Sequence, residues 1–378
     1  MIYLDNAATT YPKSENVYRA LDEANRENAF NSGRGSYKAA REATAIIDDA
    51  KNKLRKLANA SDNSDVILTP SITVAMNQIL QGLDFHRGDI VYMSPYEHNA
   101  VARVLHLLEK RIGIIVKELP LLPDTLEIDL ETTKYLFAKD KPICVCCTHV
   151  SNVTGYILPI KEIFESAKRY NSYTVLDTAQ SFGLIEIEKD WKIDFLAFAG
   201  HKTLYGPLGV GGFINYHNHM LQEVIVGGTG SDSLNLDMPI IGTSRYEASS
   251  ANVVAVKGLS VALEEALLKE SYETEKELLK YLVDKLQEID NIRMFLPPED
   301  KHIGMVSFVV EGYKSEDVGM ILDEDYDIAV RTGYHCAPNI HKWLKDEEYL
   351  GTVRVGLSKF NSRKDIDLLC DALEMLCS

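Results

Sequence analysis

A single cysteine, Cys336, stands in a polar segment whose composition suits a reactive loop. The segment RTGYHCAPNI (residues 331–340) places His335 directly before this cysteine and Arg331 five positions upstream. The thiolate is the reactive form of cysteine, and nearby cations such as these two side chains could favour it. A lone cysteine is more often a small buried apolar residue than a catalyst. The segment alone therefore leaves packing, metal binding and nucleophilic attack open.

Two further segments place polar residues directly after apolar runs of strand length. VLDTAQSFG holds Asp177 and Gln180, and FLAFAGHKTLYG holds His201 and Lys202. In a parallel α/β sheet, ligands bind at the carboxyl ends of the strands. A lysine there is costly unless it is neutralised or used covalently, and a Schiff base with an aldehyde cofactor does both. An aspartate beneath such a cofactor keeps a pyridine nitrogen protonated. An ordinary Asp–Lys ion pair remains the alternative.

The elements that must position these residues predict a large α/β fold. Continuous apolar runs alternate with helical stretches, which is typical of a mostly parallel sheet whose strands are covered on both faces. The runs are DVILTP, DIVYMSP, GIIVKELP, PICVCCTHV, YTVLDTAQ, DFLAFAGHK and GVGGFINY. Helical spacing is clearest at residues 37–57, 73–85, 99–111 and 159–171.

The alternation of apolar strand-length runs with helices ends near residue 250. A long helical stretch follows, and after it come two more strands and helices at 315–325 and 363–376. We therefore expect a large domain at 1–250 and a smaller α/β domain at 251–378, with roughly the first 14 residues packing with the smaller one. The Gly/Ser-rich stretch 227–250 has a length at which loops are usually functional or disordered.

Composition narrows the class of protein. The chain has 378 residues, 46% of them apolar and 25% charged, as in ordinary globular proteins. The net charge of −16 argues against a nucleic-acid partner and against docking to an anionic membrane. No apolar run approaches the length of a membrane span, and the first residues lack the pattern of a secretory signal. We therefore expect a cytoplasmic protein.

The six cysteines do not predict a disulfide framework in such a protein. The run CVCC at 144–147 lies inside an apolar stretch of strand length, and no second Cys/His cluster offers further metal ligands. We expect a structural strand there and no metal site. Cys370 falls on the apolar stripe of the last helix and is expected in the core.

Seven motifs, in sequence order, resemble one protein family. They are YLDNAATT near the start, EHNA at 97–100, HVSNVTG at 149–155, DTAQ at 177–180, GHK at 200–202, RTGYHCAP at 331–338 and TVRVGLSKFN at 352–361. The chain is similar to the cysteine desulfurases and selenocysteine lyases within the class V aminotransferases, and its short Cys336 loop resembles the second group of that family. The resemblance implies a homodimeric pyridoxal 5′-phosphate (PLP) enzyme with the aspartate-aminotransferase fold, PLP fold type I.

The resemblance assigns roles around the cofactor ring. Lys202 resembles the Schiff-base lysine, and Asp177 resembles the partner of the pyridine nitrogen. His98 resembles the histidine that stacks on the ring and moves protons, with an exposed histidine at a helix start as the alternative. Asn152 resembles the residue that hydrogen-bonds the cofactor's 3-oxygen.

The phosphate is expected at the start of the helix after TPSIT, where free backbone N–H groups favour an anion. Thr73 adds a hydroxyl there, either as a ligand or as a helix cap, and Gln180 and His201 complete the cradle. Three departures from the family pattern concern this group, the first being SITV at 71–74 in place of a GTTE-like motif. Ala199 stands where relatives commonly have a serine, and Ser250, in ASSAN, is the candidate contact to the phosphate of the partner subunit.

The resemblance also implies a substrate site. Arg354 lies within an apolar strand and is expected to bind the substrate carboxylate with two hydrogen bonds, an ordinary ion pair being the alternative. Arg331, Asn6 and Ala8 are expected to line the same pocket. With this scaffold, Cys336 is expected to be a nucleophile.

The expected reaction converts L-cysteine to L-alanine, with the sulfur held on Cys336 as a persulfide and passed to an acceptor protein or thiol. The alternatives are a selenocysteine lyase or another class V PLP aminotransferase or lyase, none of which needs the cysteine step. A catalytically silent binding or scaffold subunit is the alternative from a different class.

Overall fold

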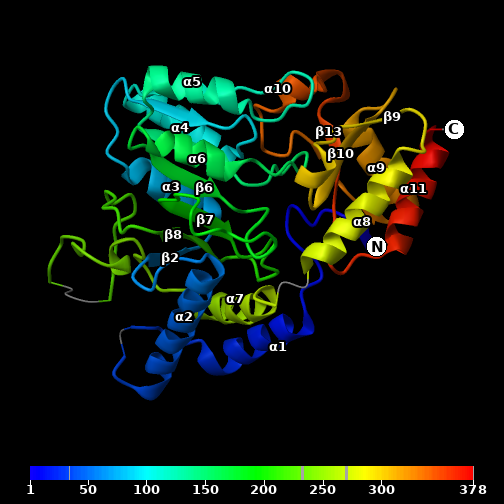
Figure 1. The fold of residues 1–378 in the computed structure, drawn as a ribbon. Helices are drawn as coiled ribbons and strands as arrows, with labels where there is room; N and C mark the ends of the chain where they lie inside the picture. The colour runs from blue at the N-terminus through cyan, green and yellow to red at the C-terminus, as the bar shows by residue number, and fades with distance from the viewer. Residues whose placement is uncertain (34, 231–233, 269–270, 378) are drawn as a thin grey trace.

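Two sheets of different size dominate the computed structural model, which describes residues 1–33, 35–230, 234–268 and 271–377. A seven-stranded sheet occupies the larger part of the molecule, and a four-stranded sheet lies beside it (Figure 1). Both chain termini lie on the side of the smaller sheet.

The large sheet has the spatial order β2, β8, β7, β6, β5, β3, β4. The bounds are Asp65–Thr69 (β2), Gly211–Asn215 (β8), Phe195–Ala199 (β7), Tyr173–Asp177 (β6), Cys144–Thr148 (β5), Ile90–Met93 (β3) and Ile115–Glu118 (β4). Neighbouring strands are parallel from β7 to β4, and β8 runs antiparallel to both of its neighbours. The expectation of a mostly parallel sheet is confirmed.

Helices cover both faces of this sheet, which explains the continuous apolar runs. One face packs against α3 (Ile72–Gly82) and α4 (Asn99–Arg111). The other packs against α2 (Lys38–Leu57), α5 (Leu130–Asp140), α6 (Ile160–Lys168) and α7 (Val253–Ala266).

The CVCC run is strand β5, as expected. Cys144 and Cys146 point into the core on one side, and Val145 and Cys147 into the core on the other. All are fully buried. Among the described residues no group of side chains could hold a metal ion.

The smaller sheet is antiparallel, in the order β12, β13, β10, β9. Its strands are Arg331–Gly333 (β12), Thr352–Gly356 (β13), Met305–Val310 (β10) and Ile292–Met294 (β9). The core beside it is formed with α8 (Ser271–Leu286), α9 (Ser315–Tyr326) and α11 (Arg363–Cys377). The short helix α10 (His341–Leu344) follows the Cys336 segment.

The N-terminal segment joins the smaller sheet region before it crosses to the larger one. Strand β1 (Ile2–Tyr3) pairs in parallel with β11 (Ile328–Ala329), and Leu4 lies in the core of the smaller domain. Helix α1 (Glu15–Glu23) then packs against α7. Short helical turns complete the described elements: a π-helical turn at Ala24–Asn28 and 3₁₀ turns at Thr243–Arg245, Glu299–Lys301 and Glu347–Tyr349.

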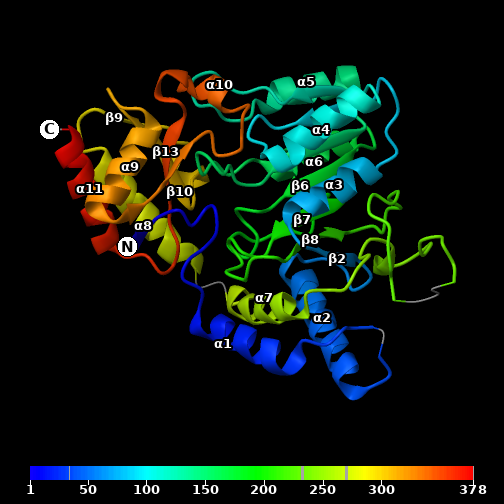
Figure 2. The ribbon, with the colours of Figure 1, turned by 180° about the vertical axis from the view of Figure 1, so that it is seen from behind.

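Helix α7 belongs with the large sheet, although a boundary at residue 250 assigns it to the smaller domain. It packs against α1 and α2, the arrangement visible from behind in Figure 2. Its residues Val256, Leu259 and Leu263 lie in the large core, whereas Leu278 of the next helix, α8, lies in the smaller core. We therefore propose that the two domains meet between α7 and α8.

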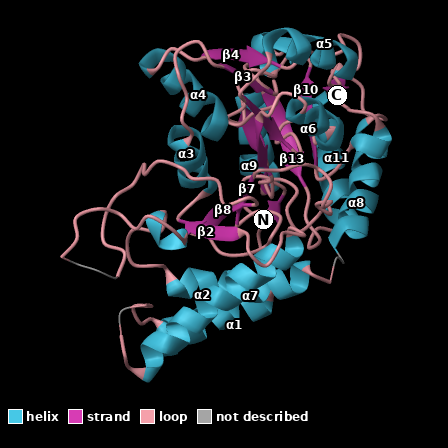
Figure 3. Cartoon of the chain, turned by 60° about the vertical axis from the view of Figure 1, so that its left-hand side comes forward, coloured by secondary structure: helices cyan, strands magenta, loops and turns pink. Residues whose placement is uncertain are grey.

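The Gly/Ser-rich stretch 227–250 lies in a long loop between β8 and α7 that extends away from the body of the molecule (Figures 1 and 3). Residues 231–233 of this stretch lie outside the described residues. In the part of the chain that the structure describes, no helix is both long and apolar enough to cross a membrane.

Candidate active site

Lys202 lies on a tight turn that follows the buried strand β7. Gly200 donates a hydrogen bond to the Val210 carbonyl at 3.0 Å, and Gly206 donates to Gly200 at 2.8 Å. A Cβ on Gly200 would lie 2.7 Å from the Val210 oxygen, and one on Gly206 would lie 2.7 Å from the Gly200 oxygen. Only glycine allows this close approach of backbones, and the turn directs Lys202 to the carboxyl edge of the sheet.

Asp177 ends the neighbouring strand β6 and faces the same edge. One of its carboxylate oxygens, Oδ1, accepts a hydrogen bond from the Ala179 N–H at 2.8 Å. Burial raises the pKa of Asp177, while the Lys202 amine acts in the opposite direction. No other hydrogen bond reaches this carboxylate from the described residues, so its second oxygen is available to a ligand.

The amine of Lys202 is poised to lose its proton. Burial lowers its pKa from the ordinary 10.5 to about 8. Asp177 opposes this shift, and the cations Arg354 and Arg331 strengthen it. Among the described residues no carboxylate is hydrogen-bonded to this amine, so Asp177 acts on it through its charge rather than as a direct ion-pair partner.

His98 caps α4 and is neutral at physiological pH. Its Nδ1 accepts a hydrogen bond from the Ala100 N–H at 3.0 Å, so the ring proton resides on Nε2. Burial lowers the pKa of His98 to about 4, and the positive charges of Lys202, Arg331 and Arg354 act in the same direction. The ring is therefore partly buried beside these cations rather than exposed on a helix start.

Arg354 is 1% exposed at the centre of β13. Its Nη1 donates to the Asn152 carbonyl at 2.8 Å, and its Nη2 donates to Asp5 Oδ1 at 2.7 Å. Nε has no partner in the structure. The guanidinium thus forms one ion pair and keeps further N–H groups for an anion. Asp5 was not singled out from the sequence, although it lies within the YLDNAATT motif.

Cys336 is exposed, so the packing interpretation is wrong. The thiol lies 3.7 Å from Arg331 Nη2, and Arg331 is the cross-strand partner of Arg354. The suggestion that His335 adds a second cation is also wrong, because burial holds the pKa of His335 well below its usual range, with Arg354 acting in the same direction. The positive field at the thiol therefore comes from the two arginines.

The Cys336 segment is hydrogen-bonded to both Asn99 and Asn152. The Asn99 N–H, the first of α4, donates to the Cys336 carbonyl at 2.7 Å. The Asn152 side-chain amide donates to the His335 carbonyl at 2.7 Å. These contacts join residues far apart in the sequence into one site. Asn99 was missed by the sequence reasoning, although it follows His98 within EHNA.

Of the side chains expected to contact the phosphate, some are free to do so and others are hydrogen-bonded elsewhere. Ser71, not Thr73, caps α3, because its Oγ accepts from the Val74 N–H at 3.3 Å. The cap alternative for Thr73 is therefore wrong, and its exposed side chain remains a candidate ligand. The Gln180 amide donates to the Ala7 carbonyl at 2.8 Å, and Nδ1 of His201 is buried without a partner.

The other residues expected at the phosphate and substrate sites lie in different parts of the fold. Ala199 is buried at the end of β7, and Ser250 is exposed in the loop before α7. Asn6 donates to the Gly356 carbonyl at 3.0 Å and to Asn361 at 3.1 Å, and Ala8 donates to the Asp5 carbonyl at 3.0 Å. Asn6 thus ties the N-terminal segment to the smaller domain.

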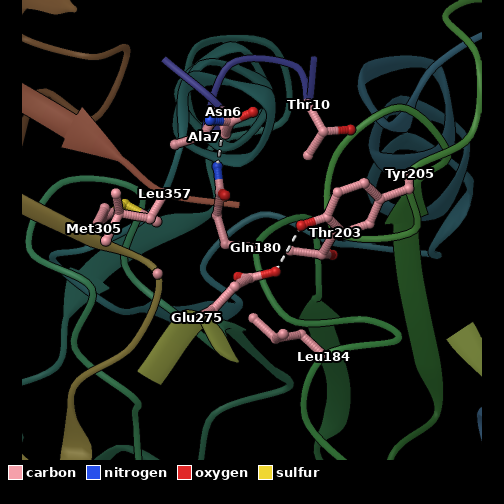
Figure 4. Close-up of a pocket in the computed structure, with 11 residues that line it drawn as sticks. Asn6, Ala7, Thr10, Gln180, Leu184, Thr203, Tyr205, Glu275, Met305 and Leu357 are labelled. Carbon is pink, nitrogen blue, oxygen red and sulfur yellow. Dashed lines mark hydrogen bonds between the residues drawn. The ribbon is translucent and has the colours of Figure 1, made fainter. Parts of the chain in front are cut away.

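A small cavity is lined by Gln180, by Tyr205 of the Lys202 turn and by Glu275 of α8 (Figure 4). Its volume of about 20 Å³ is enough for one water molecule. Across it, the Tyr205 hydroxyl donates to Glu275 of α8 at 2.7 Å. Burial raises the pKa of Glu275 to about 7. Tyr205 also accepts a hydrogen bond from the Lys359 N–H at 2.9 Å, so it links the Lys202 turn to the smaller domain.

The residues present fit PLP. The Nδ1 atom of His201 is buried without a partner and provides an acceptor or donor for a phosphate, and the free Lys202 amine can bond covalently to an aldehyde. Asp177 keeps an oxygen for a pyridinium N–H. A buried polar group is costly to leave unpaired. The amine, the carboxylate and the imidazole nitrogen would each gain a partner in PLP: its aldehyde, its pyridine nitrogen and its phosphate.

Residues 2–369 match the family Aminotransferase class-V. Among curated proteins, the chain is 33% identical to a probable cysteine desulfurase of Halalkalibacterium halodurans, over 99% of this chain and 92% of the relative. It is 30% identical to a cysteine desulfurase of Haloferax volcanii, over 99% of this chain and 89% of the relative.

Solved structures give the same picture. The apo structure of a cysteine desulfurase from Thermococcus onnurineus superposes with a TM-score of 0.90 at 28% identity, covering 99% of this chain and 94% of that one. The cysteine desulfurase CsdA from Escherichia coli, in an S-sulfonic acid form, gives a TM-score of 0.85 at 26% identity, with the same coverage.

Proposed function

The chain belongs to the class-V aminotransferases and, within them, to the cysteine desulfurases, and we propose that it converts L-cysteine to L-alanine and passes the substrate's sulfur through Cys336. The observation that carries this proposal is the position of the thiol. Cys336 is exposed, lies 3.7 Å from Arg331, and is joined through Asn99 to the helix that His98 caps.

Several side chains of this protein would hold PLP. Lys202 would bond its aldehyde carbon, Asp177 would pair with the pyridine nitrogen, and His201 and Thr73 would contact the phosphate. When bound, the cofactor supplies an electron sink at the substrate's Cα.

The substrate carboxylate is assigned to Arg354. Its N–H groups outside the Asp5 and Asn152 contacts supply charge-assisted hydrogen bonds in a buried site, where such bonds are strong. Arg331, on the neighbouring strand, adds positive charge. Together they bring the amino acid's sulfur toward the Cys336 segment.

Proton movement is assigned to Lys202 and His98. The Lys202 amine, with a pKa of about 8, is basic enough to take the Cα proton and loses its own proton readily. His98 Nε2–H can exchange a proton with the substrate thiol, because Nδ1 is fixed as an acceptor. The Cys336 thiolate then attacks the substrate sulfur: the S–S bond forms, the Cβ–S bond breaks, and its electron pair remains on Cβ, which is protonated to give alanine.

The sulfur acceptor, a thiol or a sulfur-carrier protein, is assigned to a groove beside Cys336. The groove has a volume of about 900 Å³ and is lined by Tyr334 and Pro338, which flank the cysteine, and by α4 and β4. We also propose a homodimer, supported by exposed apolar side chains in the loop between β8 and α7, and a cytoplasmic location, supported by six free cysteines.

The proposal is tested with purified protein, PLP, L-cysteine and dithiothreitol, with alanine and sulfide measured together. We expect equimolar products from the wild type and a loss of at least about 100-fold in Cys336→Ala. Cys377→Ala removes a partly exposed thiol outside the site and should leave both rates unchanged. Alanine production that survives Cys336→Ala would contradict the proposal and favour a lyase, which parallel assays with selenocysteine would identify.

A further inference from the structure

The turn that carries Cys336 has a strained backbone. The Ala337 N–H donates to the Tyr334 carbonyl at 3.0 Å, which closes a four-residue turn with His335 and Cys336 at its centre. Their φ angles are +46° and +58°. Two consecutive left-handed residues define a type I′ turn, which glycine, asparagine and aspartate normally occupy. Such a conformation persists only where the surroundings fix it.

The backbone carbonyls of Tyr334, His335 and Cys336 each contact a hydrogen-bonding group that lies outside the turn. Asn152 binds the His335 carbonyl and the Asn99 N–H binds the Cys336 carbonyl, each at 2.7 Å. Both of these anchors come from the large domain. The third anchor is His341, whose Nε2 lies 3.1 Å from the Tyr334 carbonyl oxygen.

His341 is held in turn by a buried carboxylate. Its Nδ1 lies 2.6 Å from Asp346 Oδ2, and both residues are buried, at 3% and 0% exposure. Both partners of the ring, a carboxylate and a carbonyl, are acceptors. Contacts at both ring nitrogens fix the orientation of the imidazole between Asp346 and the Tyr334 carbonyl. The Tyr334 ring lies edge-on to His341, with centroids 5.1 Å apart.

We propose that His341, oriented by Asp346, is a positioning residue for the nucleophile. It hydrogen-bonds none of the residues assigned to the cofactor or to the substrate carboxylate, and it lies among the residues that line the acceptor groove. It fixes the Tyr334 carbonyl, so the turn keeps its left-handed backbone and holds the Cys336 thiol beside Arg331. The inference rests on the proposed function only in taking Cys336 as the nucleophile. Loss of His341 should therefore slow sulfur transfer without weakening substrate binding.

Three substitutions separate positioning from stability. His341→Phe keeps a ring of similar size but has no donor, and His341→Gln keeps one amide N–H that can reach the Tyr334 carbonyl. Asp346→Asn is nearly isosteric and removes the charge that orients the ring. The matched control is His302→Phe, because buried His302 also contacts a carbonyl, that of Met305 at 2.8 Å, away from the Cys336 turn.

The first readout is steady-state desulfuration. A displacement of about 1 Å in a reacting group lowers rates by up to about 100-fold. We expect His341→Phe to lower kcat by about tenfold or more while KM for cysteine and the yellow colour of the bound cofactor stay unchanged. His341→Gln should recover much of the loss, and His302→Phe should leave kcat unchanged.

The second readout needs no cofactor or turnover. The alkylation rate of Cys336 by iodoacetamide at neutral pH is measured by peptide mass spectrometry in the Cys377→Ala background. We expect His341→Phe and Asp346→Asn to alkylate several-fold more slowly, because the thiol leaves Arg331. Failure of the proposed function alone would appear as no desulfuration in the wild type, with this alkylation pattern intact.

The inference is overturned if His341→Phe alkylates and desulfurates within about twofold of the wild type, or if His341→Gln is no better than His341→Phe in both readouts. Should His341→Phe not fold, Asp346→Asn decides in its place, and alkylation at the wild-type rate in that variant overturns the inference equally.

Discussion

At the scale of single residues, burial decides which groups in the site carry charge. It lowers the pKa of Lys202 to about 8 and that of His98 to about 4, and it holds the pKa of His335 well below its usual range. The arginines keep their charge in all ordinary conditions. The site therefore contains two permanent positive charges, those of Arg331 and Arg354. These charges act on the Lys202 amine and the His98 ring, which can exchange protons.

The lowered pKa of Lys202 predicts how PLP enters the protein. The neutral amine attacks the aldehyde, and its fraction rises as pH increases through the pKa. The rate of cofactor incorporation into cofactor-free protein should therefore rise from pH 6.5 and level off above about pH 9, around the pKa of about 8. Stopped-flow absorbance of the developing yellow colour measures this rate, with Lys202→Ala as the control. A rate still climbing toward pH 10.5, the region of an ordinary lysine, would contradict the burial argument.

At the scale of elements, the sequence predicts a helix or strand best where the pattern of apolar residues lies within that one segment. The helix expected at 99–111 and the strand expected in the CVCC run both appear, because periodicity and continuous apolar runs reflect burial on known faces. The strand ends that carry Asp177 and Lys202 were predictable for the same reason. The family resemblance then connected these ends with the Cys336 segment.

Other features of the site depend on contacts that no local pattern contains. The hydrogen bond from Arg354 to Asp5 joins residues 349 positions apart. The neutral state of His335 follows from burial by the fold, whereas the sequence shows only a histidine beside a cysteine. The left-handed turn at Cys336 is likewise hidden, because its central residues are not those that such turns prefer. Helix α7 continues an unbroken helical pattern, so its place in the large core could not be read from that pattern.

At the scale of the whole molecule, elements of the two sheets meet around the site. Cys336 and Arg354 come from the segment that forms the smaller sheet, and Lys202, Asp177 and His98 lie at or after the ends of strands of the larger one. The N-terminal segment crosses between them and contributes Asp5 to Arg354. The long loop between β8 and α7 instead faces away, and its Leu234 and Leu236 are each 98% exposed.

These two leucines predict the oligomeric state. Fully burying each side chain contributes about 1.5–3 kcal/mol, so Leu234→Ser with Leu236→Ser should weaken a homodimer by roughly 100-fold or more. Analytical ultracentrifugation across a dilution series measures the dissociation constant. Tyr135→Ser on α5, at a side chain 67% exposed, is the control and should leave association unchanged. A monomeric wild type, or equal association in the double variant, would contradict this assignment.

The central claim is that sulfur passes through Cys336, and peptide mass spectrometry tests it most directly. The PLP-loaded protein is mixed with a small excess of L-cysteine and no reductant, then digested without reducing the thiols. We predict one added sulfur atom on the peptide that contains Cys336, formed in equal amount to the alanine released, and none on the Cys377 peptide. Alanine released with no sulfur on Cys336 would contradict the account.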